Sequence, residues 1–296
     1  MSTEFKRATG VIIAEVVNSN PNGGPDEDGD PRQRSNGLGE ISPPSVKRKA
    51  RDLVDDHDAP VFQQLPGIFS DNPDHYCILE SRGRDRSEIS KELKEGQPKN
   101  GFNQEAFLNS PFVQKYWDAR VFGNTYLEGT SNKGFVKTGV VHFGLGLSVA
   151  PINIIRHTLT NKAGVEEGKN SGMAPLSYRV VEHGVYVIPF YVNPNQAHLT
   201  GCDANDIELL KTLLPHIYEL NRSLIRTDIR LRHVWYIEHK NLLGSCPDYL
   251  LLEALTPERL GDPMEPSQSW KDYKDKSCLP DDLLRRVDSC IDLVNC

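Results

Sequence analysis

The sequence predicts an α+β protein built around a single sheet. Residues 8–17 are apolar on both alternating faces, which is typical of a central strand that is covered on both sides. Residues 137–149 alternate more regularly than any other part of the chain, which indicates a second strand. Apolar residues at helical spacing occur at about 43–56 and again after Asp203. Together with two later strands, these segments give the order strand, helix, strand, strand, helix, strand.

Size and composition are those of an ordinary soluble protein. The chain has 296 residues, 38% of them hydrophobic and 25% charged, which suffices for one elaborated domain or two small ones. It has no apolar run of about 18 residues and no secretory signal, so we expect no membrane span and a cytoplasmic location. Six cysteines without a C-x-x-C pair argue against a zinc ribbon or a disulfide framework. The dispersed histidines form no ligand pattern, and the sequence predicts no metal and no cofactor.

Charge is distributed unevenly along the chain. The formal net charge is -7, but residues 31–51 contain six basic residues and one acidic residue. From Cys246 onward, eleven acidic residues stand against six basic ones. A local basic field attracts phosphates even on an acidic chain, so the net charge does not exclude a nucleic-acid partner. The acidic C-terminal part is either a solubilising surface or a contact for a basic protein neighbour.

A polar turn follows the first strand, with the sequence NSNPNGGPDEDGDPRQR at residues 18–34. Asparagine and glycine tolerate left-handed backbone conformations, and the asparagine amides offer hydrogen-bond donors and acceptors at the end of the sheet. Arginines near the end of the turn add positive charge. The predicted contacts of this turn to a phosphate chain are Asn18, Asn20, Asn22, Arg32 and Arg34.

The first helix has one apolar and one basic face. Ser42 suits its N-cap and Pro43 its first turn. The apolar stripe is formed by Val46, Ala50, Leu53 and Val54. The basic cluster lies in the first turns, where the helix N-terminus also favours anions, and consists of Lys47, Arg48 and Arg51.

The remaining elements complete the sheet. One face of 137–149 is rich in glycine, which indicates the close approach of a protein or nucleic-acid backbone, or crowded packing of the sheet against a helix. Residues 183–192 form the next strand, in which Pro189 implies an edge position or a bulge. Asp203 caps the second helix, and residues 229–239 alternate as the last strand.

This order predicts a ferredoxin-like, or RRM-like, palm with both helices on one face and the other face open to RNA or to insertions. The second insertion has strand-like ends and a glycine-rich tip, so we expect a β-hairpin that projects from the sheet. Within a single elaborated domain, 1–296, the expected divisions are a palm at 8–56, 137–150 and 182–240, a mixed helical insertion at 57–136, the hairpin at 151–181 and an acidic extension at 241–296.

Three aspartates of the turn, Asp26, Asp28 and Asp30, have the alternate spacing of a calcium loop. Such a loop needs glycine where Pro31 stands and glutamate where Gly37 stands, so a calcium site is not expected. No histidine or lysine lies nearby in the sequence to assist catalysis. We expect a solvated loop, with a catalytic magnesium site as the alternative.

Four segments carry a family resemblance. They are the polar turn with GLGEIS and the basic helix SVKRKARDL, the DARVFG box at 118–123, the segment GFVKTGVVHFGLGLSVAPINIIRHT, and YVNPN at 191–195. Together they resemble the backbone subunits of type I CRISPR Cascade complexes in the RAMP superfamily, most like those of types I-C and I-B. The resemblance spans roughly residues 10–240. It departs from the family at Phe135 and Lys137, where proline and glutamine are frequent, and at ISPPS, where a VTD-like sequence is frequent.

The resemblance implies a guide-RNA-binding subunit that is not an enzyme. Copies would polymerise head to tail along a CRISPR guide RNA, beside other Cascade subunits, and the hairpin of each copy, its thumb, would displace one base. The exposed segments would pair with target DNA while the protein contacts sugar and phosphate. The further RNA contacts implied are Arg120, Lys137, Lys169, Asn170, Met173 and Arg179, with a structural ion pair as the alternative role of Arg120.

Two other functions remain open. The first is a backbone subunit of a related CRISPR complex that cleaves RNA with a loop aspartate and magnesium. The second is a monomeric RRM-type regulator that binds short RNA by aromatic stacking. Against the second, the strands at 8–17 and 183–192 lack the paired aromatic signature of such domains.

Overall fold

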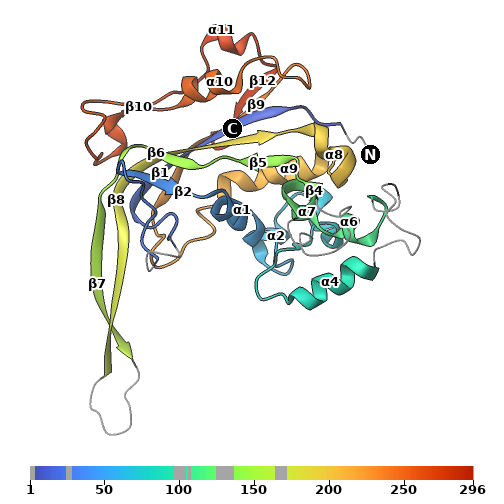
Figure 1. Cartoon of the computed structure of the whole chain (residues 1–296), viewed down its shortest axis with the longest axis horizontal. Coiled ribbons are helices and arrows are strands. Elements are labelled where there is room, and N and C mark those ends of the chain that lie inside the picture. Colours follow the sequence, from blue (N-terminus) through green and yellow to red (C-terminus); the bar gives the residue numbers. More distant parts are fainter. Residues whose placement is uncertain are drawn as a thin grey trace.

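The computed structural model describes residues 4–24, 29–95, 105, 108–124, 137–163 and 172–295. An eight-stranded sheet forms its centre, made of β1 (Ala8–Ser19), β2 (Leu38–Ile41), β5 (Val141–Phe143), β6 (Gly146–Pro151), β7 (Ile154–Ala163), β8 (Gly172–Val192), β9 (Ile229–Glu238) and β12 (Ser289–Asp292). The main path has the spatial order β12-β9-β1-β8-β6-β2, while β5 and β7 also pair with β8 (Figure 1). Helices and this antiparallel sheet confirm the predicted α+β class.

The other elements are short. Two small sheets pair β3 (Gly123–Asn124) with β4 (Lys137–Thr138) and β10 (Glu258–Arg259) with β11 (Tyr273–Lys274). The helices are α1 (Pro43–Asp52), α2 (Pro60–Gln63), α3 (Gly67–Ser70), η1 (Pro73–His75), α4 (Arg86–Glu95), α6 (Pro111–Lys115), α7 (Trp117–Phe122), η2 (Pro194–Gln196), α8 (Ala197–Thr200), α9 (Ala204–Leu213), η3 (Leu214–His216), α10 (Asp248–Leu255), η4 (Trp270–Asp272) and α11 (Asp281–Leu284). Among the described residues, no helix is both long and apolar enough to span a bilayer.

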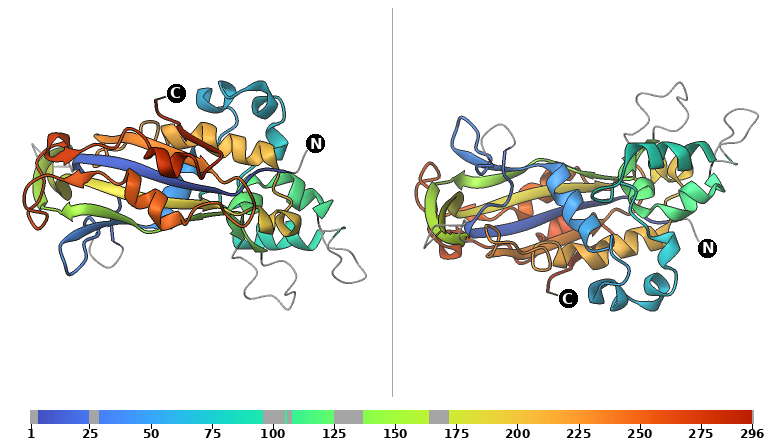
Figure 2. Two further views of the ribbon diagram at one scale, coloured as in Figure 1. Left: turned by 90° about the horizontal axis from the view of Figure 1, so that it is seen from above. Right: turned by 90° about the horizontal axis from the view of Figure 1, so that it is seen from below.

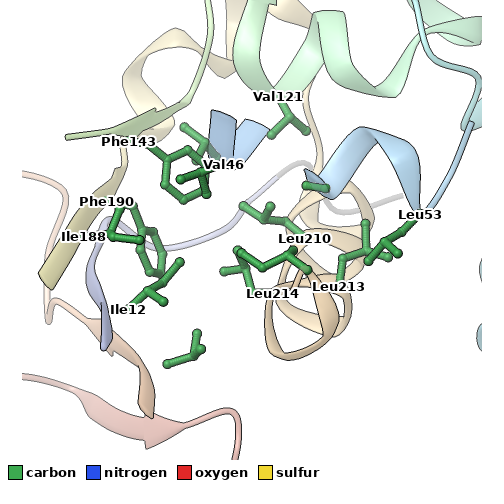
Figure 3. Close-up of a cluster of buried hydrophobic side chains, with 14 of the residues drawn as sticks. Ile12, Val46, Leu53, Val121, Phe143, Ile188, Phe190, Leu210, Leu213 and Leu214 are labelled. Atoms are coloured by element: carbon green, nitrogen blue, oxygen red, sulfur yellow. The ribbon is translucent and has the colours of Figure 1, made fainter. Parts of the chain in front are cut away.

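Helices α1 and α9 pack on one face of the sheet (Figure 3). Val46 of α1 and Leu210 of α9 are buried with Ile12 of β1, as the predicted apolar stripes require. Helix α9 begins where it was predicted, because the carboxylate of Asp203 accepts a hydrogen bond from the backbone N–H of Asp206 at 3.0 Å. The first helix is shorter than predicted, since α1 ends at Asp52.

The opposite face of the sheet is covered by the C-terminal layer, residues 241–295 (Figure 2). Leu251 and Leu255 of α10 pack with Trp235 of β9 and Val11 of β1 in a second core. The sequence allowed this face to stay open to RNA or to be covered by the insertions. In the structure the cover comes from the acidic C-terminal part, which the sequence analysis treated as an extension.

A histidine fastens the C-terminal layer to the sheet. His233 of β9 is hydrogen-bonded through Nδ1 to Asp292 at 2.7 Å and through Nε2 to Asp275 at 3.0 Å. Burial lowers the pKa of His233, but the hydrogen bonds to the two carboxylates outweigh it and raise the pKa above the ordinary 6.5. A ring that donates at both nitrogens is an imidazolium, so this contact depends on protonation.

The strand predicted at 137–149 is broken by a bulge. Phe143 pairs with Phe190 and Leu147 pairs with Val187, so the β5–β6 side has one more residue than β8 between these pairs. An extra residue reverses the alternation of faces. A Cβ on Gly144 would lie 2.7 Å from Pro189, which shows that protein packing accounts for this glycine. Of the two expectations for Pro189, the bulge is the one found.

Strand β9 carries a second bulge. His233 pairs with Ile13 and Leu231 pairs with Ala14, which leaves Arg232 as the additional residue. The single alternation predicted for 229–239 is therefore wrong, and Leu231 packs with the helix-side core. His233 and Trp235 are buried on the other side.

Strands β7 and β8 form a hairpin that extends away from the body of the molecule on the side of α1 (Figure 1). Their pairing is continuous from Ile154 with Val181 to Ala163 with Gly172. β8 has 21 residues and runs from this hairpin to the centre of the sheet. The hairpin and the core therefore share one strand.

Candidate nucleic-acid interface

The asparagine turn lies at the end of β1 next to the base of the hairpin. Asn18 is exposed and has φ 43°, the left-handed conformation that the turn composition predicts. The Asn20 amide donates to the carbonyl oxygen of Gly29 at 2.8 Å and to that of Arg179 at 3.4 Å. The Asn22 Oδ1 accepts from the backbone N–H and the hydroxyl of Ser42, at 2.7 and 2.8 Å.

These contacts divide the three asparagines by role. Asn20 and Asn22 are buried, and their amides hold the turn against the hairpin and against the start of α1. Ser42 occupies the N-cap position as predicted, but its hydroxyl bonds Asn22 instead of capping the helix. Asn18 alone of the three presents its side chain to solvent.

Arginines of the turn and of the hairpin pair with acidic residues. Arg32 and Arg34 share Glu40, at 3.4 and 3.1 Å. Arg179 forms an ion pair with Asp30, which joins the hairpin to the turn. Because one carboxylate serves both Arg32 and Arg34, this pair of arginines keeps a net positive charge.

The basic face of α1 is more neutralised than the sequence predicts. Arg48 lies 3.4 Å from Asp52 and also donates to the carbonyl oxygen of Glu80. Arg51 is only 5% exposed, with Nε 2.8 Å from Asp118 and Nη1 3.0 Å from the Glu80 carboxylate. A buried guanidinium that already has two carboxylates cannot reach a phosphate without breaking both pairs, which makes Arg51 a less favourable RNA contact than the sequence indicated.

Lys47 differs from its neighbours on α1. It is half-buried, and no carboxylate of the described residues lies within ion-pair distance of its ammonium. Nζ lies 5.4 Å from the centre of the Phe122 ring. Burial, and secondly the charge of Arg51, lower the pKa of Lys47. Among the predicted cations of α1, this one gains most from an incoming anion.

Arg120 of the DARVFG box has a structural role. It is 2% exposed and forms a bidentate ion pair with Asp206, with Nε–Oδ2 at 2.8 Å and Nη2–Oδ1 at 2.7 Å. Its Nη1 also donates to the carbonyl oxygens of Val113 and Gln114. Of the two roles expected for Arg120, the structure shows the ion pair, and burial leaves the guanidinium little access to RNA.

Some predicted residues lie outside the described structure. For Lys169 and Asn170 neither backbone nor side chain is described. Lys137 and Met173 lie on β4 and β8, but their side chains are outside the described part. Asp26 and Asp28 are also outside it. Where side chains are described, no group of three or more possible metal ligands occurs.

Four cations outside the predicted set lie on α1, on β7 and on the loop before β9. Arg156 is exposed on β7, where it pairs in register with Arg179. Arg222 and Arg226 lie on the loop before β9, and Lys49 lies on α1. Of the described residues, no carboxylate lies within ion-pair distance of any of the four. Only the fold reveals them, because the loop and the hairpin are far from the turn in sequence.

The sequence profile of the CRISPR-associated protein Cas7 matches residues 6–277. The chain belongs to the Cas7 family. The resemblance drawn from the polar turn, the basic helix and the DARVFG box is thereby confirmed. No curated protein sequence gives a match.

Solved structures with a related arrangement include two described as "CRISPR RNA-guided surveillance complex", one of them in a pre-nicking state. Both are 14% identical and cover 78% of this chain, with 77% and 68% of their own chains covered and TM-scores of 0.43 and 0.41. A type III-B Cmr-beta complex bound to cognate target RNA is 12% identical, with 79% of this chain and 61% of its own chain covered and a TM-score of 0.39.

Proposed function

We propose that this Cas7-family chain is a non-catalytic backbone subunit that binds CRISPR guide RNA in a type I Cascade surveillance complex. Copies assemble head to tail along the guide, together with other Cascade subunits in the cytoplasm, and leave bases free to pair with target DNA. The protein contacts the sugar-phosphate chain and does not read sequence.

One observation carries this proposal. The hairpin leaves the sheet on the side of α1, next to the asparagine turn, while the C-terminal layer covers the other side (Figure 1). Among the described residues, the cations with no carboxylate within ion-pair distance include Lys47 and Lys49 of α1 and Arg156 at the base of this hairpin. A strand of RNA that follows these groups meets donors and positive charge and avoids the acidic layer.

The palm-and-thumb interpretation belongs to the same proposal. Strands β9, β1, β8 and β6 stand in the order of a ferredoxin-like palm, with α1 and α9 on one face. We assign the palm to residues 8–56, 137–150 and 182–240, the inserted segment to 57–136 and the thumb to 151–181. In this assignment the acidic residues 241–296 form a layer of the palm.

The alternative, an RNA-cleaving subunit, has less support. Asp30 is paired with Arg179, so its carboxylate is engaged and is not free to bind magnesium. Incubating the guide-loaded protein with complementary RNA and magnesium tests this alternative. Cleavage at regular intervals that disappears in Asp26→Asn or Asp28→Asn would replace our proposal with the catalytic one.

Removing cations that have no carboxylate within ion-pair distance among the described residues tests the RNA surface. We expect Lys47→Gln with Arg156→Gln to weaken binding of a labelled oligouridylate, measured by fluorescence anisotropy over a range of salt concentrations. The slope of log K against log salt should fall by about 0.7 for each lost phosphate contact. The weakening should be the same for other RNA sequences.

The matched control removes two charges from the C-terminal layer. Lys271 and Lys274 are exposed there, and Lys271→Gln with Lys274→Gln changes the net charge by the same amount. We expect this pair to leave the affinity and the salt slope unchanged. Equal losses in both double variants would mean that net charge, not a defined surface, governs binding.

The identity of the RNA is tested directly. RNA extracted from the protein, after expression with a CRISPR array, should consist of spacer sequence flanked by repeat sequence. Size-exclusion chromatography with a long guide should show several copies per RNA. One bound copy with no repeat-derived RNA would support the monomeric regulator instead.

A further inference from the structure

The loop that precedes β9, residues 217–228, closes over the end of β1 and over α1. The backbone N–H of Asn20 donates to the carbonyl oxygen of Ile225 at 2.6 Å, and the Asn221 amide donates to the carbonyl oxygen of Lys49 at 2.9 Å. Figure 1 shows this loop beside the asparagine turn and near the base of the hairpin. The loop thereby covers the side of α1 on which Lys49 lies.

Lys49 is a buried cation without a counter-ion. It is 7% exposed, and its ammonium donates to the Ser45 hydroxyl at 3.1 Å and lies 5.1 Å from the centre of the Tyr218 ring. No carboxylate of the described residues lies within ion-pair distance. Burial, and secondly the charge of Arg226, lower the pKa of Lys49 to about 8. Proteins rarely bury a lysine in this way unless something pairs with it.

Two further donors adjoin this ammonium. Arg226 donates a hydrogen bond from Nε to the carbonyl oxygen of Asn20 at 3.1 Å. Its charge is close enough to lower the pKa of both Lys49 and Tyr218. The Tyr218 hydroxyl is buried and has no hydrogen-bond partner. An ammonium, a guanidinium and a hydroxyl therefore lie near one another, and the described residues supply no carboxylate within ion-pair distance of the ammonium, although the charge of Asp52 still acts on it.

We propose that Lys49, Arg226 and Tyr218 form a binding site for a phosphate-type oxyanion beneath the 217–228 loop. An oxyanion accepts hydrogen bonds from all three groups and removes the repulsion between the two cations. The source of the phosphate is the backbone of the RNA strand, in which case this site rests on the proposed function. Inorganic phosphate offers the same chemistry and serves as the probe.

The site distinguishes Lys49 from the cations that the sequence favours. Arg48 and Arg51 already have carboxylate partners, so an anion gains little from them. At Lys49, a bound anion would compensate the charge of a buried ammonium that has no carboxylate within ion-pair distance among the described residues. Binding there should also fasten the loop to α1, because Arg226 belongs to the loop and Lys49 to the helix.

The test follows Lys49 itself. In protein labelled with ¹³C-lysine, the Cε signal of Lys49, assigned with Lys49→Met, reports its pKa. We expect inorganic phosphate, added at constant ionic strength, to raise that pKa by one unit or more and to increase Tm in a saturable manner. Lys49→Met and Arg226→Gln should lose the increase in Tm, while the control Lys211→Met should retain it.

A short oligouridylate is then added in place of phosphate. If RNA and phosphate both raise the pKa of Lys49, the site and its RNA source are supported. If RNA binds wild type and Lys49→Met equally and the pKa of Lys49 does not move with either probe, the inference is wrong while the proposed function stands. If phosphate raises the pKa but no RNA binds, the oxyanion site stands and the proposed function fails.

Discussion

Replacing Lys49 by methionine should stabilise the free protein. Methionine fills most of the volume of the lysine side chain, but it removes a buried ammonium that has no carboxylate within ion-pair distance among the described residues, and with it the cation–π contact with the Tyr218 ring. The cost of that ammonium is set by burial and by the charge of Arg226. Substitutions at buried polar sites usually destabilise a protein, so a measured stabilisation would be strong evidence that the Lys49 ammonium is uncompensated.

The magnitude follows from the pKa. Burial and Arg226 lower the pKa of Lys49 from 10.5 to about 8. At roughly 1.4 kcal/mol per pKa unit, the charged form costs about 3 kcal/mol in the folded protein. The hydrogen bond to Ser45 and the contact with the ring are lost in the variant, at about 1 kcal/mol each. The expected net gain in the free energy of unfolding is about 1 kcal/mol.

The direction of the pKa shift also determines how the stability advantage of Lys49→Met changes with pH. The folded-state pKa lies below the unfolded one, so the cost is fully present below about pH 8 and disappears by about pH 10.5 as the unfolded chain also loses its proton. The advantage of Lys49→Met should therefore be large at about pH 7 and small at about pH 10. Urea denaturation of both proteins at the two pH values measures this difference.

The control is Lys211→Met on α9. The Lys211 ammonium lies 2.7 Å from the Glu208 carboxylate and 5.2 Å from the centre of the Tyr236 ring, so its removal should not stabilise the fold. If Lys49→Met is no more stable than wild type at neutral pH, or if its advantage is the same at both pH values, then Lys49 is not an uncompensated cation. The oxyanion site would then lose its physical basis.

Three further substitutions test the packing. Arg120→Met leaves the Asp206 carboxylate buried without its partner, and we expect urea denaturation to show a loss of about 3 to 5 kcal/mol, whereas a loss below about 1 kcal/mol would contradict the role of the pair. Gly10→Ala places a carbon 2.0 Å from the Phe190 ring, so Tm should fall by an amount equivalent to about 1 to 3 kcal/mol, and an unchanged Tm would refute the close contact. Because the pKa of His233 is raised above 6.5, its stabilisation is fully present below that pH and is lost as pH rises through the folded-state value. His233→Gln should therefore cost more at about pH 5.5 than at about pH 8.5, and equal costs would show that the ring is not an imidazolium.

Much of the fold could be predicted from periodicity and capping. The central strands show an alternating or wholly apolar pattern, and Asp203 marks the start of α9. Both signals depend on local geometry alone, so they can be read from the sequence. Pro189 indicated one of the two bulges, but the bulge in β9 could not be predicted, since an extra residue becomes visible only when the partner strand is known. The reversal of faces at Arg232 is an example.

The candidate site was harder to predict, because the sequence does not reveal which acidic residue pairs with a given basic residue in the fold. Arg51 and Arg120 look the same as free cations until Asp118 and Asp206 are brought beside them from later segments of the chain. Lys49 shows the converse. It was not among the predicted contacts, yet Lys49, like Lys47, has no carboxylate within ion-pair distance among the described residues. Long-range ion pairing, not composition, thus decides which basic residues remain available.

The C-terminal layer makes the molecule two-sided. Its inner leucines complete a core with Val11 and Trp235, while its outer surface carries the acidic excess. A chain shortened to residue 240 would expose that apolar sheet to water and to its own copies, so such a fragment should aggregate and would be a poor reagent. The acidic excess of this layer disfavours polyanions on that face, so in the proposed function the RNA would approach from the face that carries α1 and the hairpin.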